Sequence, residues 1–288
     1  MPRRYVQLDV FASRPGTGNP LGAVFDAGDM DSAAMQALAA WLNLSETIFF
    51  LPPEAGADYR IRIFTPGSEL PFAGHPSVGA AWLAATHGLA TPRAGRLIQQ
   101  CAAGLLPAEV HGDPRQPGIR LRSPRGRLLD ATALTAPADL AAIARAGSPI
   151  ERWNNGPSWW LIEADSPAQL RSLKPDFAAI TAWTNATSAT GVAVFVAEPA
   201  PGHQLAVRAF CPGDAVGVPE DPVTGSANAL IAAWLHRQGR LPGQDGRYVA
   251  SQGRELGRDG RVSLQVDADG EVWIGGEVRQ VIEGTLDW

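Results

Sequence analysis

The sequence predicts an α+β protein made of two similar halves, each an antiparallel, barrel-like sheet curled around one central helix. Residues 62–83 and 208–235 repeat one pattern. A strand of alternating polar and apolar residues is followed by a Pro-Gly turn, a polar segment and an apolar helix that contains Trp-Leu. The helical segments, 78–89 and 227–235, are apolar nearly all round. A helix of that kind is normally buried, so a sheet wrapped around it explains both patterns.

The duplication extends to the elements that precede this pattern. In each half a polar turn leads into an apolar strand, a helical segment follows, and then comes a second apolar strand, which we expect at the edge of the sheet. These elements are 17–20, 21–25, 30–42 and 47–51 in the first half, and 154–157, 159–162, 166–180 and 191–196 in the second. The matching order favours an internal duplication.

A chain of 288 residues is long enough for two domains of ordinary size. Turn-forming residues are frequent in 123–137, which places the boundary near residue 128. The expected domains are therefore 1–128 and 129–288. The last part of the chain predicts a hairpin over 261–274 followed by one more strand, and packing of that strand on the first domain is the alternative.

Composition excludes several classes of protein. The chain is 45% hydrophobic and 18% charged, as expected for a packed globular protein rather than a disordered one. A net charge of −5 gives no support for nucleic-acid binding. We find neither an apolar run of about 18 residues, the length of a membrane span, nor a secretory signal. We therefore expect a cytoplasmic protein with no membrane partner.

The reactive side chains are few. Cys101 and Cys211 are the only cysteines, and neither has a redox-pair or metal-ligand spacing, so we expect buried structural thiols. The single lysine, Lys174, lies in a polar segment, which argues against Schiff-base chemistry. The sequence has no phosphate-binding glycine loop and no Gly-x-Ser-x-Gly elbow. Four histidines form no metal-ligand pair and are expected in solvent: His87, His111, His203 and His236.

Glu46 is the first candidate for chemistry, because it lies between a predicted helix end and the apolar strand 47–51. A carboxylate flanked by apolar surface has a raised pKa, which suits removal and return of a proton near neutral pH. The alternative is a helix-end carboxylate that contacts only solvent.

His75 is the second candidate, in Gly74-His75-Pro76 at a predicted helix start. Glycine permits close approach to a ligand, and proline suits the first helical position. The positive end of a helix lowers the pKa of an imidazole, so a neutral ring is expected. A purely structural histidine is the alternative.

Asp221 is the third candidate, within 220–228 at the second helix start. The alternative is a simple N-terminal cap, since Asp, Thr and Ser all cap helices well. One cap is enough for a helix, and this segment supplies several polar groups and a glycine. The excess suggests that Gly225 and Ser226 offer N–H and hydroxyl groups to a carboxylate, as helix starts do for anions.

At these residues the chain resembles the PhzF-like isomerases of phenazine biosynthesis, over essentially its whole length. The resemblance rests on motifs in a specific order. They are Asp-Val-Phe (9–11), Thr-Gly-Asn-Pro (17–20), Asn-Leu-Ser-Glu-Thr (43–47), Arg-Ile-Phe-Thr-Pro (62–66), Gly-His-Pro (74–76), Glu-Asp-Pro-Val-Thr-Gly-Ser-Ala (220–227) and Val-Trp-Ile-Gly-Gly (272–276).

The resemblance implies the diaminopimelate epimerase-like fold, with the active site between two similar domains, a homodimer, and no metal or organic cofactor. It also implies that a glutamate, here Glu46, moves a proton on a dihydro-hydroxyanthranilate-like acid. His75 and Asp221 match the family's other polar site residues. Four residues match its carboxylate-binding positions: Ser45, Gly74, Gly225 and Ser226.

The expected function is therefore a cofactor-independent isomerase acting on a small unsaturated carboxylic acid in a biosynthetic process. The alternative is a non-catalytic protein on the same fold that binds small acids or a partner. Related racemases of this fold use two cysteines as acid and base. Because Cys101 and Cys211 lie outside the corresponding turns, two-thiol racemisation is disfavoured.

Overall fold

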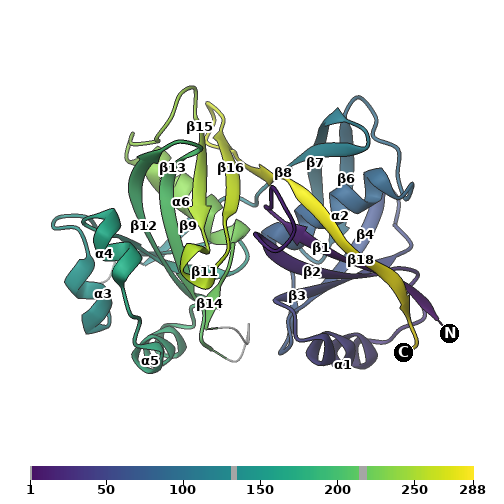
Figure 1. Cartoon of the computed structure of the whole chain (residues 1–288), viewed down its shortest axis with the longest axis horizontal. Coiled ribbons are helices and arrows are strands. Elements are labelled where there is room, and N and C mark those ends of the chain that lie inside the picture. Colours follow the sequence, from purple (N-terminus) through teal and green to yellow (C-terminus); the bar gives the residue numbers. More distant parts are fainter. Residues whose placement is uncertain (1, 131–134, 214–218) are drawn as a thin grey trace. The chain divides into compact units, whose positions relative to one another are not determined.

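The computed structural model describes residues 2–130, 135–213 and 219–288. The chain forms two compact units, of which the first comprises Met1–Arg122 with Ile274–Trp288 and the second Ser123–Trp273 (Figure 1). The sequence places the boundary near residue 128 and leaves open where the last strand packs. No helix in the described ranges is long and apolar enough to cross a bilayer.

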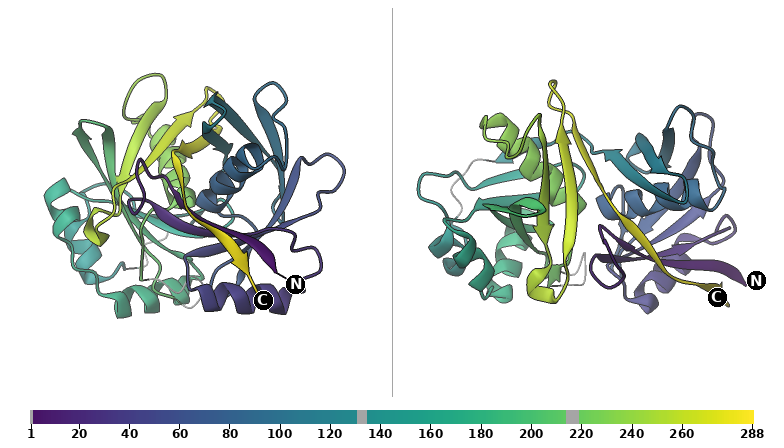
Figure 2. Two further views of the ribbon diagram at one scale, coloured as in Figure 1. Left: turned by 45° about the vertical axis from the view of Figure 1, so that its right-hand side comes forward. Right: turned by 45° about the horizontal axis from the view of Figure 1, so that its top comes forward.

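The first unit is a sheet whose strands pair in the order β18–β1–β2–β3–β4–β6–β7–β8, with the short β5 also on β4. The C-terminal strand lies antiparallel to the N-terminal one along its length, as both views in Figure 2 show. The strands are β1 (Arg3–Val10), β2 (Asn19–Val24), β3 (Glu46–Leu51), β4 (Tyr59–Phe64), β5 (Glu69–Leu70), β6 (Arg96–Cys101), β7 (Gly104–Asp113), β8 (Gln116–Arg122) and β18 (Val278–Leu286).

Helix α2 (Gly74–Thr86) is the central helix of this unit. It contacts β1, β2, β3, β4, β6, β7, β8 and β18, so strands surround it on most sides. Its residues Gly74 to Ala84 are all buried. Gly79 is required where the helix meets the sheet, because an added Cβ would lie 2.5 Å from a methyl carbon of Leu21. The nearly all-apolar sequence of this helix thus matches its burial.

Helix α1 (Ser32–Leu42) packs against β3 and β4. Asp31 caps it, since its side chain accepts a hydrogen bond from the N–H of Ala34. The face with Met35, Leu38 and Ala39 is buried and forms a hydrophobic cluster with Phe49.

The second unit repeats this connectivity, with its strands in the order β9–β10–β11–β12–β13–β15–β16 and β14 also on β13. The strands are β9 (Arg127–Asp130), β10 (Glu151–Asn154), β11 (Ser158–Glu163), β12 (Gly191–Ala200), β13 (His203–Phe210), β14 (Glu220–Asp221), β15 (Arg247–Gln252) and β16 (Gly260–Val266). The helices are α3 (Ala138–Ile143), α4 (Pro167–Ser172), α5 (Phe177–Thr187) and α6 (Gly225–Arg237). Strand β17 (Val272–Gly276) follows β16 and contains the boundary between the units, after Trp273.

The pairing directions confirm the internal duplication. β2 and β3 are parallel, as are β11 and β12. β4 is antiparallel to β3 and β5 and parallel to β6, and β13 has the same three relations to β12, β14 and β15. Helix α6 takes the place of α2 and is buried along nearly all of its length.

Two details differ from the sequence prediction. The sheets are mixed rather than wholly antiparallel, because a helix separates β2 from β3 and supplies the crossover that parallel neighbours need. The strands predicted at sheet edges, β3 and β12, each lie between two partners. Their residues are mostly buried on both faces, which is typical of an interior strand.

Other side-chain predictions have mixed outcomes. Cys101 and Cys211 are buried and free, as expected. The prediction that His203 lies in solvent is wrong. It is buried because Glu198 and Arg261 both contact its ring nitrogens, at 3.0 and 2.7 Å.

A duplicated ion pair stabilises the turn before each central helix. In the first unit Arg62 Nε and Nη2 donate to the two carboxylate oxygens of Glu69 at 2.7 and 2.6 Å. In the second unit Arg208 binds Glu220 in the same way at 2.9 and 2.8 Å. Each guanidinium also lies 5.0 Å from the ring of a phenylalanine two residues on.

We expect the two copies of this ion pair to contribute different amounts to the free energy of unfolding. The side chains of Arg208 and Glu220 are 5% and 7% exposed, against 21% and 36% for Arg62 and Glu69. Arg208→Met leaves a buried carboxylate without its cation and should lower the free energy of unfolding by about 3–5 kcal/mol. Arg62→Met should cost about 1 kcal/mol. Urea denaturation of both variants measures the contrast, and equal losses would contradict it.

Candidate active site

The predicted site residues fall into two groups, one in each unit. The first unit holds Ser45, Glu46, Gly74 and His75, at the start of β3 and the start of α2. The second unit holds Asp221, Gly225 and Ser226, in β14 and the start of α6. In each unit, the candidate residues therefore lie beside or within a strand and at the start of the central helix.

Glu46 is the first residue of β3, opposite Leu21 in the parallel pair with β2. The residue is only 7% exposed and its neighbour Ser45 is also buried. The alternative of a solvent-exposed carboxylate at a helix end is therefore wrong. A buried carboxylate is costly unless it is paired or used, which keeps Glu46 as the leading candidate for chemistry.

His75 lies beside this carboxylate, with its Nε2 3.3 Å from Oε2 of Glu46. It is the second residue of α2, which begins at Gly74, so Pro76 takes the third helical position rather than the first. The residue is 2% exposed, and burial lowers the pKa of its imidazole to about 3. The ring is therefore neutral at physiological pH, as the sequence predicts.

Asn19 fixes the orientation of this imidazole. Its side-chain Nδ2 lies 3.3 Å from Nδ1 of His75, and both residues are buried. With Nδ2 of Asn19 directed at the ring, Nδ1 is the acceptor and the proton of the neutral ring is on Nε2. Nε2 of His75 lies 3.3 Å from Oε2 of Glu46 but forms no hydrogen bond with it.

The loop that carries Asn19 is itself held by a buried carboxylate. Asp9 accepts hydrogen bonds from the N–H groups of Thr17 and Gly18 at 2.9 and 3.1 Å. Gly18 permits this tight turn, because an added Cβ would lie 2.1 Å from the carbonyl oxygen of Val10. Asp9 and Asn19 belong to motifs of the family resemblance, but no signal in the sequence assigns them a role in the site.

The second unit has an equivalent arrangement. Asn155, from the polar turn that matches 17–20, donates to the carbonyl oxygen of Ser226 at 3.0 Å. Ser226 Oγ also accepts from the indole of Trp159 at 3.2 Å. Ser226 is the second residue of α6, as His75 is of α2. The duplication therefore includes an asparagine that holds the first turn of the central helix.

Asp221 is buried and does not cap α6. The N-cap residue is Thr224, whose hydroxyl donates to Oδ2 of Asp221 at 2.7 Å instead of bonding to the first turn. The first helical turn of α2 likewise has no side-chain cap, because its N-cap residue is Ala73. By contrast, Asp31 and Asp176 cap α1 and α5. A helix start without such a cap has first-turn N–H groups that can bind an anion.

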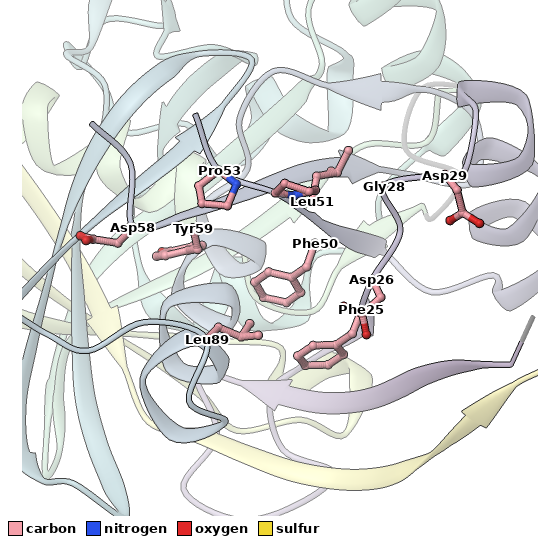
Figure 3. Close-up of a pocket in the computed structure, with 11 residues that line it drawn as sticks. Phe25, Asp26, Gly28, Asp29, Phe50, Leu51, Pro53, Asp58, Tyr59 and Leu89 are labelled. Atoms are coloured by element: carbon pink, nitrogen blue, oxygen red, sulfur yellow. The ribbon is translucent and has the colours of Figure 1, made fainter. Parts of the chain in front are cut away.

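A separate pocket of about 420 Å³ lies in the first unit (Figure 3). Phe25, Phe50, Tyr59 and Leu89 line it, together with residues that follow β2 and β3. It lies at the opposite ends of these strands from Asn19 and Glu46, so the candidate site residues do not contribute to it. The described residues contain no group of three or more His, Cys, Asp or Glu side chains that could hold a metal ion.

Comparison with known proteins identifies the family. A sequence model of the family described as phenazine biosynthesis-like protein matches residues 8–284. A trans-2,3-dihydro-3-hydroxyanthranilate isomerase from Pseudomonas aeruginosa is 37% identical over 273 residues, which cover 93% of this chain and 92% of that protein. A Schizosaccharomyces pombe protein named antisense-enhancing sequence 1 is 30% identical over 97% of each chain.

A solved structure confirms the fold class. A PhzF-family phenazine biosynthesis protein from Bacillus anthracis superposes with a TM-score of 0.84 at 24% identity, covering 99% of both chains. The fold, the ordered motifs and the match over nearly the whole sequence agree with one another. The chain belongs to the PhzF-type isomerase family of phenazine biosynthesis-like proteins.

Proposed function

We propose that the protein is a cofactor-independent isomerase that shifts a proton between two carbons of a small unsaturated carboxylic acid, with Glu46 as the acid and base. The observation that carries this proposal is the buried Glu46–His75 pair, 3.3 Å apart, with Glu46 at the start of β3 and His75 in the first turn of α2. The 37% identical relative, named for an isomerase of trans-2,3-dihydro-3-hydroxyanthranilate, supports a substrate of that chemical class.

The proposed reaction balances without a second reactant. The Glu46 carboxylate removes a proton from a carbon next to the unsaturated system, and the electron pair of that C–H bond moves into the conjugated system. The resulting carboxylic acid of Glu46 then returns a proton, either the one removed or one exchanged with solvent, to another carbon on the same face. Glu46 ends as a carboxylate, and no oxidant or reductant is needed.

His75 has a different role in this proposal. Its neutral ring offers the Nε2 proton as a hydrogen-bond donor, and because its pKa is low the ring does not carry a positive charge near neutral pH. It can therefore orient the Glu46 carboxylate or a substrate oxygen. Ser45 and the first turn of α2 at Gly74 would bind the substrate carboxylate, as helix starts bind anions.

Asp221, Gly225 and Ser226 are proposed to bind and orient the substrate as well. The expectation that both groups of residues serve one substrate stays a prediction. A double-mutant cycle between Glu46→Gln and Asp221→Asn would test it, because residues that act on one substrate give non-additive losses. The expected homodimer also stays a prediction, which sedimentation velocity of the purified chain would test.

The direct test of function uses trans-2,3-dihydro-3-hydroxyanthranilate as the probe in D₂O. We expect catalytic loss of this compound and an isomeric product, followed by NMR and mass spectrometry. Activity should survive dialysis against EDTA, since the proposed step uses no metal. Tight binding of the probe without isomerisation or exchange would contradict the proposal.

A second candidate function is a non-catalytic binding protein. It is favoured by one observation, the 30% identical relative whose name refers to antisense enhancement rather than to an enzyme. The D₂O experiment separates the two candidates, because a binding protein retains the probe acid and never exchanges its protons.

A further inference from the structure

A buried polar cluster in the second unit surrounds Asp221. It consists of Asp221, Thr224, Asn228 and Gln252, all buried, with Gln252 only 1% exposed. Gln252 is the last residue of β15, and the other three lie in β14 or around the start of α6. The cluster thus joins a strand end, the candidate substrate-binding carboxylate and the first turns of the central helix.

The side-chain amide of Gln252 has one possible orientation. Its Oε1 accepts from the N–H of Thr224 at 3.1 Å, and its Nε2 donates to the carbonyl oxygen of Asp221 at 2.9 Å. A backbone N–H can only donate and a carbonyl can only accept, so a flipped amide would lose both bonds. Asn228 agrees with this assignment, because its Nδ2 donates to the carbonyl oxygen of Thr224 and to Oε1 of Gln252.

This orientation also sets the direction of the next hydrogen bond. Nε2 of Gln252 donates to the hydroxyl oxygen of Thr224 at 3.0 Å. The single proton of that hydroxyl is then available for Oδ2 of Asp221, which lies at 2.7 Å. The Gln252 amide, the Thr224 hydroxyl and the Asp221 carboxylate therefore form a chain of donors that ends on the carboxylate.

We propose that Gln252 is a positioning residue for Asp221, acting through the Thr224 hydroxyl and without contact to substrate. This inference rests on the proposed role of Asp221 in substrate binding. An amide is required at position 252, because a carboxylate has no N–H to donate and would add a negative charge beside Asp221. Because the Thr224 hydroxyl bonds to Asp221 instead of to a backbone N–H of α6, the first turn of this helix has no side-chain cap.

The test compares Gln252→Glu with Thr224→Val and with a control, Gln204→Glu. Gln204 lies on the neighbouring strand β13, and its side chain bonds to the N–H of Val249 in β15. We expect Gln252→Glu and Thr224→Val each to lower kcat/KM about 10–100-fold, since displacement of a positioned group by about 1 Å has effects of that order. Gln204→Glu should change kcat/KM less than about twofold.

Non-additivity separates positioning from a purely structural role. In an Asp221→Asn background, Gln252→Glu should have little further effect, because the group that it positions is already lost. If the fold-losses in kcat/KM of the two single variants multiply in the double variant, the proposal is overturned. Gln252→Met, which keeps the shape of the side chain, provides a second variant if Gln252→Glu does not fold, and it should show the same non-additivity.

A measurement without activity distinguishes failure of this inference from failure of the proposed function. In ¹⁵N NMR spectra of the folded protein, Gln252→Met should shift the Thr224 amide resonance and speed its hydrogen exchange. An unchanged Thr224 amide overturns the hydrogen-bond chain itself. If the amide responds but Asp221→Asn leaves kcat/KM unchanged, the role of Asp221 in the proposed function fails, and the positioning claim fails with it.

Discussion

Glu46→Gln is expected to lower the rate of proton transfer to and from carbon by at least about 10³-fold, near the upper range for loss of a general acid–base group. Glutamine keeps the size and most of the shape of the side chain but cannot accept and return the proton. The residue lies 3.3 Å from His75 in a buried setting, where solvent is a poor substitute for the missing base. Solvent deuterium incorporation into substrate and product measures the loss.

Two controls make this result specific. Binding of the substrate acid, measured by calorimetry, should change little, because the proposed carboxylate-binding groups remain. Glu54→Gln, a control at an exposed glutamate of the first unit that pairs with Arg60, should exchange protons like the wild type. Exchange at the wild-type rate in Glu46→Gln would exclude Glu46 as the base.

His75 is expected to make the folded protein sensitive to acid. The folded state lowers the pKa of this imidazole from 6.5 to about 3 because the ring is buried. An unfolded chain would take up the proton below pH 6.5, while the folded protein keeps a neutral ring. The associated stability is therefore fully present above pH 6.5 and is lost as the pH falls towards 3. Between pH 7 and pH 4.5 the loss should reach about 2–3 kcal/mol.

A difference measurement isolates this histidine from other groups that titrate in acid. Urea denaturation of the wild type and of His75→Gln is compared at pH 7 and pH 4.5. The wild type should lose about 2–3 kcal/mol more than the variant. His111→Gln, at an exposed histidine of the same unit, is the control and should follow the wild type. Parallel losses in wild type and His75→Gln would show that the ring takes up its proton equally in both states.

Local sequence patterns predicted much of the fold for physical reasons. The 3.6-residue spacing of Met35, Leu38 and Ala39 reflects one buried face of α1, and the largely apolar α2 and α6 are buried along most of their length. The duplication could be predicted from the sequence because each half must bury the same kind of helix in the same kind of sheet. Pairing directions could not be read, since parallel pairs such as β4 with β6 depend on contacts between distant segments.

The candidate site shows the same division. Glu46, His75 and Asp221 stood out because charged or titratable groups next to apolar segments need an explanation. Asn19 and Gln252 did not stand out, because a buried amide is recognised only by its partners. Gln252 lies 28 residues from Thr224 in sequence, and no periodicity links them. His203 was misjudged for the same reason, since its partners Glu198 and Arg261 come from two other strands, β12 and β16.

A single-turnover experiment with label on the substrate tests the central claim most directly. The substrate acid carries deuterium at the carbon that loses its proton, and excess enzyme converts it in H₂O. A single carboxylate that removes and returns the proton should deliver part of the deuterium to the new carbon, on the same face of the ring. Glu46→Gln should give no transfer. Complete loss of label with protonation of the opposite face would show that a second acid acts, and would contradict the role given to Glu46.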